Sequence, residues 1–126
     1  YTLWHTLSLH DALPIWHYPG ILFADYNSEA PVWYATICFT VMAIAFSFVM
    51  AWFRLKSGSL WTATFLHAAH NVFIQTIFTP LTADAGPTEF VIDEFGVGLA
   101  IAYVAAALIF WWMRDRISEG DTATSA

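Results

Sequence analysis

The run from Val32 to Phe53 carries no charge, and it constrains the fold more than any other feature of the chain. VWYATICFTVMAIAFSFVMAWF is 22 residues long. An α-helix of that length, at about 1.5 Å per residue, crosses a hydrocarbon core of about 30 Å. Two further uncharged runs follow, Leu60–Phe78 and Phe95–Met113, and GILF after Pro19 is typical of the tail of an earlier helix. Between the first two runs, Gly58 permits a tight turn and Ser59 can cap the next helix. We predict an all-α fold, a polytopic membrane helix bundle with three full transmembrane helices plus a truncated N-terminal one.

Composition supports a membrane protein. Hydrophobic residues make up 59% of the chain and charged residues 11%, which is far more apolar than a soluble domain. The formal net charge of −6 is spread along the sequence and does not indicate a nucleic-acid partner. The one cysteine, Cys38, lies in an apolar run, so we expect a buried, inert thiol. Membrane lipid is therefore the first expected partner.

The basic residues predict the orientation. They lie between the first two runs or just after the third: Arg54, Lys56, Arg114 and Arg116. By the positive-inside rule both places, and hence the C-terminus, are cytoplasmic. The opposite loops hold only acidic charges: Asp25, Glu29, Asp84, Glu89, Asp93 and Glu94. We expect an integral membrane protein; the resemblance given below implies the bacterial cell membrane.

Residues 1–15 read as an artefact. The codons ACT CTT TCC CTA CAC GAC GCT CTT CCG ATC translate to TLSLHDALPI, the residues from Thr6 to Ile15, and they look like a sequencing-library adapter. We therefore predict three parts: an adapter-derived segment 1–15, a domain 16–116 and a disordered polar tail 117–126. A native amphipathic N-terminus is the alternative. His5 and His10 are accordingly left out of any site.

Polar side chains interrupt the second run, WTATFLHAAHNVF. At 100° per residue, Thr64, His67, Asn71 and Gln75 fall within about 80° on one helix face, and His70 lies about 60° to the other side. Polar groups at bilayer depth face protein or water and often mark function. The stripe is compatible with interhelical hydrogen bonds or with a site. His17, beside Trp16, is an interfacial anchor or a second histidine of that site.

These residues resemble the CPBP family of intramembrane proteases, relatives of the type II CAAX prenyl endopeptidases. Trp16-His17-Tyr18-Pro19 is similar to the family's Trp-His-x-Pro motif, and His67-Ala68-Ala69-His70-Asn71 to its His-x-x-x-Asn motif. The basic turn with GSLW before the second motif is also similar. The resemblance covers residues 16 to about 115, and it implies a peptidase acting on membrane-associated substrates, such as lipid-modified peptides.

The resemblance also implies the roles of the site residues. His17, His67 and Asn71 are the predicted catalytic residues, which bind the water and stabilise the oxyanion. If the site is metal-dependent, His17 and His67 bind zinc. The family's Glu-Glu-x-x-x-Arg motif, whose glutamate acts as general base, does not occur in this chain. Glu29 and Glu94 lie in the outer loops and are not expected to replace it. We therefore expect an inactive C-terminal portion of a peptidase.

Two other functions fit the sequence. One is a non-enzymatic protein of the same fold, in self-immunity or scaffolding, whose histidines only pack. The other is a membrane haem protein with His17 and His67 as axial ligands. The DNA upstream of the Trp16 codon separates the first from a peptidase, and a haem absorbance band identifies the second.

Overall fold

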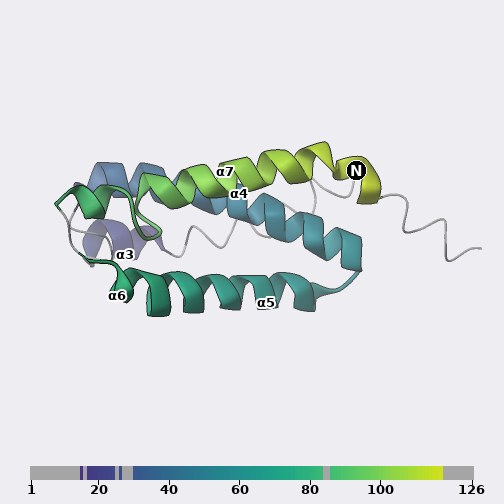
Figure 1. Ribbon diagram of the computed structural model, residues 1–126, viewed down its shortest axis with the longest axis horizontal. Helices are drawn as coiled ribbons and strands as arrows, with labels where there is room; N and C mark the ends of the chain where they lie inside the picture. The colour runs from purple at the N-terminus through teal and green to yellow at the C-terminus, as the bar shows by residue number, and fades with distance from the viewer. Residues whose placement is uncertain (1–14, 16, 25, 27–29, 84–85, 118–126) are drawn as a thin grey trace, which may run out of the picture.

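The structure is a computed structural model that describes residues 15, 17–24, 26, 30–83 and 86–117 (Figure 1). Within these ranges every regular element is helical, which confirms the predicted all-α class. In chain order the elements are α3 Tyr18–Phe23, α4 Val32–Ser57, α5 Leu60–His70, the π-helix η1 Asn71–Phe78, α6 Thr79–Leu81, the 3₁₀-helix η2 Pro87–Phe90, α7 Val97–Trp112 and the 3₁₀-helix η3 Arg114–Ile117.

Helix α4 is the longest element of the described structure. It has 26 residues, and within the described part of the chain it alone is both long and apolar enough to cross a membrane. Helix α7 is apolar but shorter, with 16 residues. The second predicted run is helical without interruption from Leu60 to Leu81, although its helix type changes at Asn71. The sequence GILF lies in α3.

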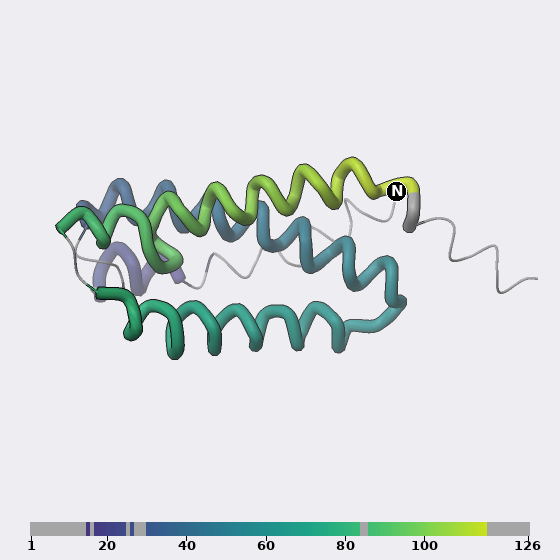
Figure 2. The backbone as a smooth tube through the Cα atoms, in the orientation of Figure 1, coloured from purple at the N-terminus to yellow at the C-terminus, as the bar shows by residue number. Residues whose placement is uncertain are grey.

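The helices are arranged around α4. Helix α7 lies along α4, and the segment α5–η1–α6 runs beneath them, connected to α4 by a tight turn (Figures 1 and 2). Short α3 packs near the first half of α4. The core side chains of α4 recur at spacings of three and four residues, as expected for one helix face. They are Ala35, Phe39, Met42, Phe46 and Met50.

The turn between α4 and α5 follows its sequence. Gly58 takes a left-handed conformation with φ of 65°, which lets the chain reverse at the end of α4. The next residue, Ser59, caps α5 by accepting a hydrogen bond from the backbone N–H of Trp61 at 3.3 Å. The predicted turn and cap are both confirmed.

The segment before α7 folds back on that helix. Asp93 has a φ of 67°, and the N–H of Gly98 donates to the carbonyl of Val91 at 3.0 Å. A Cβ atom on Gly96 would clash with the backbone of Val91 and Ile92. The glycines that begin the third predicted run therefore permit a close backbone approach. This turn carries Glu94 inward.

Some sequence predictions lie outside the described residues. These are the proposed artefact, apart from Ile15, the tail from residue 118 onward, and the acidic positions Asp25, Glu29 and Asp84. Cys38 is buried as expected, with 6% of its surface exposed.

Candidate active site

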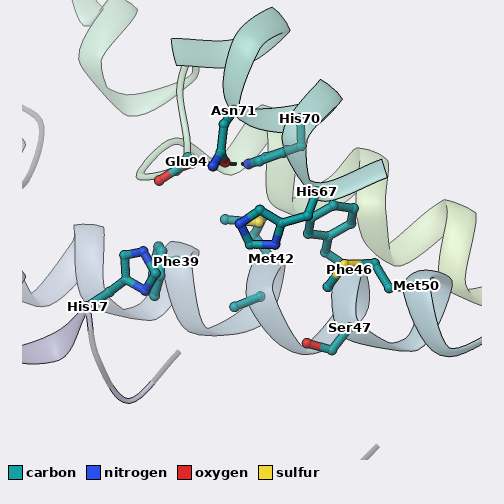
Figure 3. Close-up of a pocket in the computed structure, with 11 residues that line it drawn as sticks. His17, Phe39, Met42, Phe46, Ser47, Met50, His67, His70, Asn71 and Glu94 are labelled. Carbon is teal, nitrogen blue, oxygen red and sulfur yellow. Dashed lines mark hydrogen bonds and ion pairs between the residues drawn. The ribbon is translucent and has the colours of Figure 1, made fainter. Parts of the chain in front are cut away.

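A small cavity lies between α3, α4 and α5. His17, just before α3, lines one side, and His67 and Asn71 line the other (Figure 3). The apolar wall comes from α4: Phe39, Met42, Ala43, Phe46 and Met50. The cavity volume is about 40 Å³. A cavity must offer at least about 10–15 Å³ to hold one water molecule, so this cavity has room for a few waters.

His17 is held at the cavity by aromatic neighbours. Its ring centroid lies 5.3 Å from that of Phe39 and 6.1 Å from that of Tyr26. The neighbouring Tyr18 forms a 2.7 Å hydrogen bond with the hydroxyl of Thr40, which ties the start of α3 to α4. Two segments fifty residues apart in the sequence therefore bring His17 and His67 to one cavity.

The predicted polar stripe is partly correct. His67 and Asn71 face the cavity, and His67 also packs against Phe46 with ring centroids 6.0 Å apart. Thr64 is exposed, and its hydroxyl donates to the carbonyl of Leu60 at 3.1 Å. Gln75 reaches Glu94 rather than the cavity. The helix wheel assumed a uniform α-helix, whereas the segment from Asn71 is a π-helix with a different angular step.

His70 was predicted to lie beside the polar stripe, but the structure buries it and gives both of its ring nitrogens a polar partner. It is 7% exposed and lies between two polar partners. Its Nε2 is 3.0 Å from Oε1 of Glu94, and its Nδ1 is 2.9 Å from the hydroxyl of Tyr103. An ionised carboxylate only accepts hydrogen bonds, so Nε2 carries the proton. One signal for this residue is present in the sequence, a second histidine within a predicted span.

Glu94 corrects the prediction most directly. We expected it in an outer loop outside the helices that carry the histidines; that position is correct, but the implied separation from the histidine site is wrong. It does precede α7 outside any helix, but it is 4% exposed and lines the same cavity as His17 and His67. The backbone turn at Asp93–Gly98 carries it inward. Nothing in the local sequence of an acidic loop distinguishes a buried glutamate from a solvated one.

The surroundings of Glu94 favour its ionised form. Burial by itself raises the pKa of the carboxyl group. The hydrogen bonds from His70 and Gln75, together with the electrostatic effect of His70 and His17, outweigh burial, so the pKa of Glu94 lies below its ordinary value. Tyr26, whose hydroxyl is 3.4 Å from Oε2 of Glu94, has a raised pKa because of burial and then because of the nearby carboxylate.

The zinc site implied by the resemblance is not completed by the described residues. Within residues 15, 17–24, 26, 30–83 and 86–117, no three His, Cys, Asp or Glu side chains are placed to hold a metal ion. A catalytic zinc site needs three protein ligands and one open position. His17 and His67 would supply two of them, and Glu94 is already bonded to His70 and Gln75. The donor set among the described residues is therefore one ligand short of such a zinc site.

Comparison with known families identifies the chain. A sequence model of the family described as Type II CAAX prenyl endopeptidase Rce1-like matches residues 1–73, more than half of the chain. The chain belongs to this family. The predicted resemblance is thereby confirmed, and the matched part contains His17, His67 and Asn71. Glu94 lies beyond the matched part. Neither the curated proteins nor the solved structures include a match.

Membership of this family carries two general properties. The family consists of membrane-embedded CAAX-type proteases, and the apolar helix α4 agrees with that setting. The chain therefore belongs to a family of intramembrane hydrolases.

Proposed function

We propose that the cavity is the part of an intramembrane peptidase active site that the histidines form. The supporting observation is that His17 and His67, which are far apart in sequence, line one cavity with Asn71. In this proposal the imidazoles hold the attacking water by hydrogen bonds. The Asn71 side-chain amide donates to the oxyanion that forms when the water oxygen bonds to the peptide carbonyl carbon. The tetrahedral intermediate then collapses, the C–N bond breaks, and the leaving amine takes up the proton that the general base removed from the water.

The general base is proposed to come from outside this chain. Hydrolysis needs a group that accepts a proton from the water, and the family's Glu-Glu-x-x-x-Arg motif is not in the sequence. The carboxylate of Glu94 is held by hydrogen bonds from His70 and Gln75, and a carboxylate with a lowered pKa is a weak base. We propose that the 126-residue chain is inactive by itself.

The membrane arrangement is also a proposal. Three spans, formed by α4, the segment Leu60–Leu81 and α7, agree with their apolar sequences and side-by-side packing. The C-terminal end of α4, with Arg54 and Lys56, packs near η3. Basic residues at one end of the bundle support a cytoplasmic C-terminus. The proposed substrates are membrane-associated peptides, including lipid-modified ones.

A haem function is less well supported by the cavity. A volume of about 40 Å³ accommodates waters but is far too small for a porphyrin between His17 and His67. The peptidase therefore remains the function that the geometry supports best.

A cleavage assay tests the proposal. The full-length protein, recovered from the DNA upstream of the Trp16 codon, is compared with the 126-residue chain on a fluorogenic prenylated peptide in detergent. We expect cleavage by the full-length protein only, and His67→Ala should lower kcat at least about 100-fold. Val72→Ala, an exposed neighbour on the same helix, is the matched control and should leave kcat unchanged.

Two outcomes would contradict different parts of the proposal. Cleavage by the short chain, abolished by His67→Ala, would leave the site in place but overturn the proposed inactivity. Cleavage by the full-length protein that is unaffected by His67→Ala would overturn the site itself.

A further inference from the structure

A polar network, buried at Glu94 and His70, borders the cavity but takes no part in the hydrolysis proposed above. Oε1 of Glu94 accepts from Nε2 of His70 at 3.0 Å and from Nε2 of Gln75 at 2.6 Å. Oε2 accepts from the hydroxyl of Tyr26 at 3.4 Å. On its far side, His70 is bonded to Tyr103 of α7. The network therefore joins the cavity-bearing helix to the turn before α7 and to α7 itself.

The π-helix explains how one oxygen binds two residues of the same helix. His70 and Gln75 are five residues apart, and in a regular α-helix they would point about 140° away from each other. A π-helix has i→i+5 hydrogen bonds, so the fifth residue returns close to the direction of the first. The change of helix type from Asn71 to Phe78 thus lets both side chains reach Glu94.

Asn71 lies at the junction between the two helix types. It follows α5 directly and is the first residue of the π-helix, and its side chain lines the cavity (Figure 3). His70 and Gln75, on either side of it in sequence, are both bound to the same carboxylate. Any rotation of the helix at this junction would move Asn71 and His67 relative to His17.

The bonding of Glu94 favours a positioning role. Its two oxygens already accept from three side chains, and a carboxylate in this state holds its donors in place more readily than it accepts a proton. Residues that orient a reacting group through a second hydrogen bond are common beside catalytic sites.

We propose that Glu94 is a positioning residue that holds the 71–78 segment in π-helical form and thereby directs Asn71 and His67 into the cavity. The proposal rests on the proposed function of the cavity for its catalytic meaning. Its structural content, that the Glu94 carboxylate determines the direction of Asn71, is independent of any reaction.

Side-chain NMR of the 126-residue chain in detergent micelles tests this without a substrate. With histidine and asparagine labelled with ¹⁵N, we expect His70 to show a slowly exchanging Nε2 proton at low field. Glu94→Leu should abolish that signal and move the Asn71 side-chain amide resonances by at least about 0.1 ppm. Glu94→Gln retains an oxygen that accepts both bonds, so it should restore both features.

Two further variants keep the test decisive. Gln75→Leu removes the bonds that this exposed side chain donates to Glu94 and to the Tyr26 hydroxyl. The fold should therefore persist while the Asn71 resonances shift and the His70 proton remains. Glu89→Gln, in η2 of the same loop, should change neither. Unchanged Asn71 resonances in both Glu94→Leu and Gln75→Leu would overturn the positioning role. If Glu94→Leu does not fold, Gln75→Leu alone decides.

The result is separable from the cleavage assay. Shifted Asn71 resonances together with a full-length protein indifferent to His67→Ala would retain the network and remove the peptidase site. Unshifted Asn71 resonances together with a full-length protein whose cleavage activity requires His67 would retain the peptidase site and remove the positioning role of Glu94.

Discussion

The α4–α7 pair and the α5–η1 segment are held in place by different forces. Helices α4 and α7 meet through apolar side chains, including ring contacts of Phe110 with Trp52 at 4.8 Å and with Phe53 at 5.1 Å. Helix α5 buries only Ala63 and His70 in the described structure, and η1 buries no residue. Dispersion contacts are many and non-directional, whereas the hydrogen bonds of His70 are few and directional.

Because of this difference, we expect the apolar contacts mainly to determine the free energy of unfolding and the hydrogen bonds mainly to determine the direction of side chains at the cavity. Loss of one methyl group between α4 and α7 weakens the fold slightly without moving any particular atom. Loss of one hydrogen bond at Glu94 changes the direction of a cavity side chain. The three predictions below test the contrast, beginning with the largest expected change in the free energy of unfolding.

Phe46→Ala should have the largest effect, because Phe46 lies where the two regions meet. Its ring centroid is 4.6 Å from Tyr103 of α7 and 4.8 Å from His70 of α5, and it is 4% exposed. We expect a loss of about 3 kcal/mol in the free energy of unfolding, from lost contacts and the cavity left behind. Denaturant unfolding in mixed micelles, followed by circular dichroism, measures it.

Phe65→Ala is the matched control for that change. Phe65 lies on the outer face of α5 and is 67% exposed, so its replacement should cost less than about 0.5 kcal/mol. Equal losses for the two variants would show that the α4–α7 contacts do not extend to the polar helix.

The stabilisation that the Glu94 hydrogen bonds contribute to the fold should fall in acid. The folded-state pKa of Glu94 is below its ordinary value of 4.5 because the bonds from His70 and Gln75, with the electrostatic effect of the nearby histidines, outweigh burial. Its stabilising contribution is therefore complete above pH 4.5 and is lost as the pH falls through the lower folded value. Relative to Glu94→Gln, the unmodified chain should lose stability as the pH falls across that window.

The comparison with Glu94→Gln isolates this carboxyl group. Burial raises the pKa of the adjacent Asp93, which acts in the opposite direction as the pH falls, but Asp93 is present in both chains. Parallel unfolding curves for the two chains between pH 5 and 3 would contradict the ionised, hydrogen-bonded state of Glu94.

Trp52→Phe should have the smallest effect. The indole N–H of Trp52 is buried and has no hydrogen-bond partner among the described residues, and phenylalanine removes that group while retaining a ring beside Phe110. We expect a change within about 0.5 kcal/mol, of either sign. A loss above about 2 kcal/mol in the free energy of unfolding would mean that ring shape at the α4–α7 interface matters as much as hydrogen-bond direction does at Glu94.

Much of the scaffold could be predicted from the sequence because its signals are local. The uncharged run from Val32 indicated α4, Gly58 the reversal and Ser59 the cap. The two histidine motifs identified residues that do share one cavity. Each depends on a few neighbouring residues or on a pattern that a family preserves.

The remainder depended on contacts that no local pattern encodes. The position of Gln75 was misjudged because a switch from α- to π-helix changes the angular step, and the sequence NVFIQTIF carries no evident sign of it. Glu94 was placed in solvent because its burial requires a backbone reversal and a partner 24 residues earlier in the chain. The polar region was therefore the harder one to predict.

Proximity of residues 17 and 67 is the most direct test of the central claim, that α3 and α5 contribute to one cavity. In a Cys38→Ala background, His17→Cys and His67→Cys are combined and treated with a short thiol-specific crosslinker in native membranes. Rapid intramolecular crosslinking is predicted, with none when His67→Cys is replaced by Phe65→Cys on the outer face of the helix. Crosslinking that is absent for residue 67, or equal for both positions, would contradict the account.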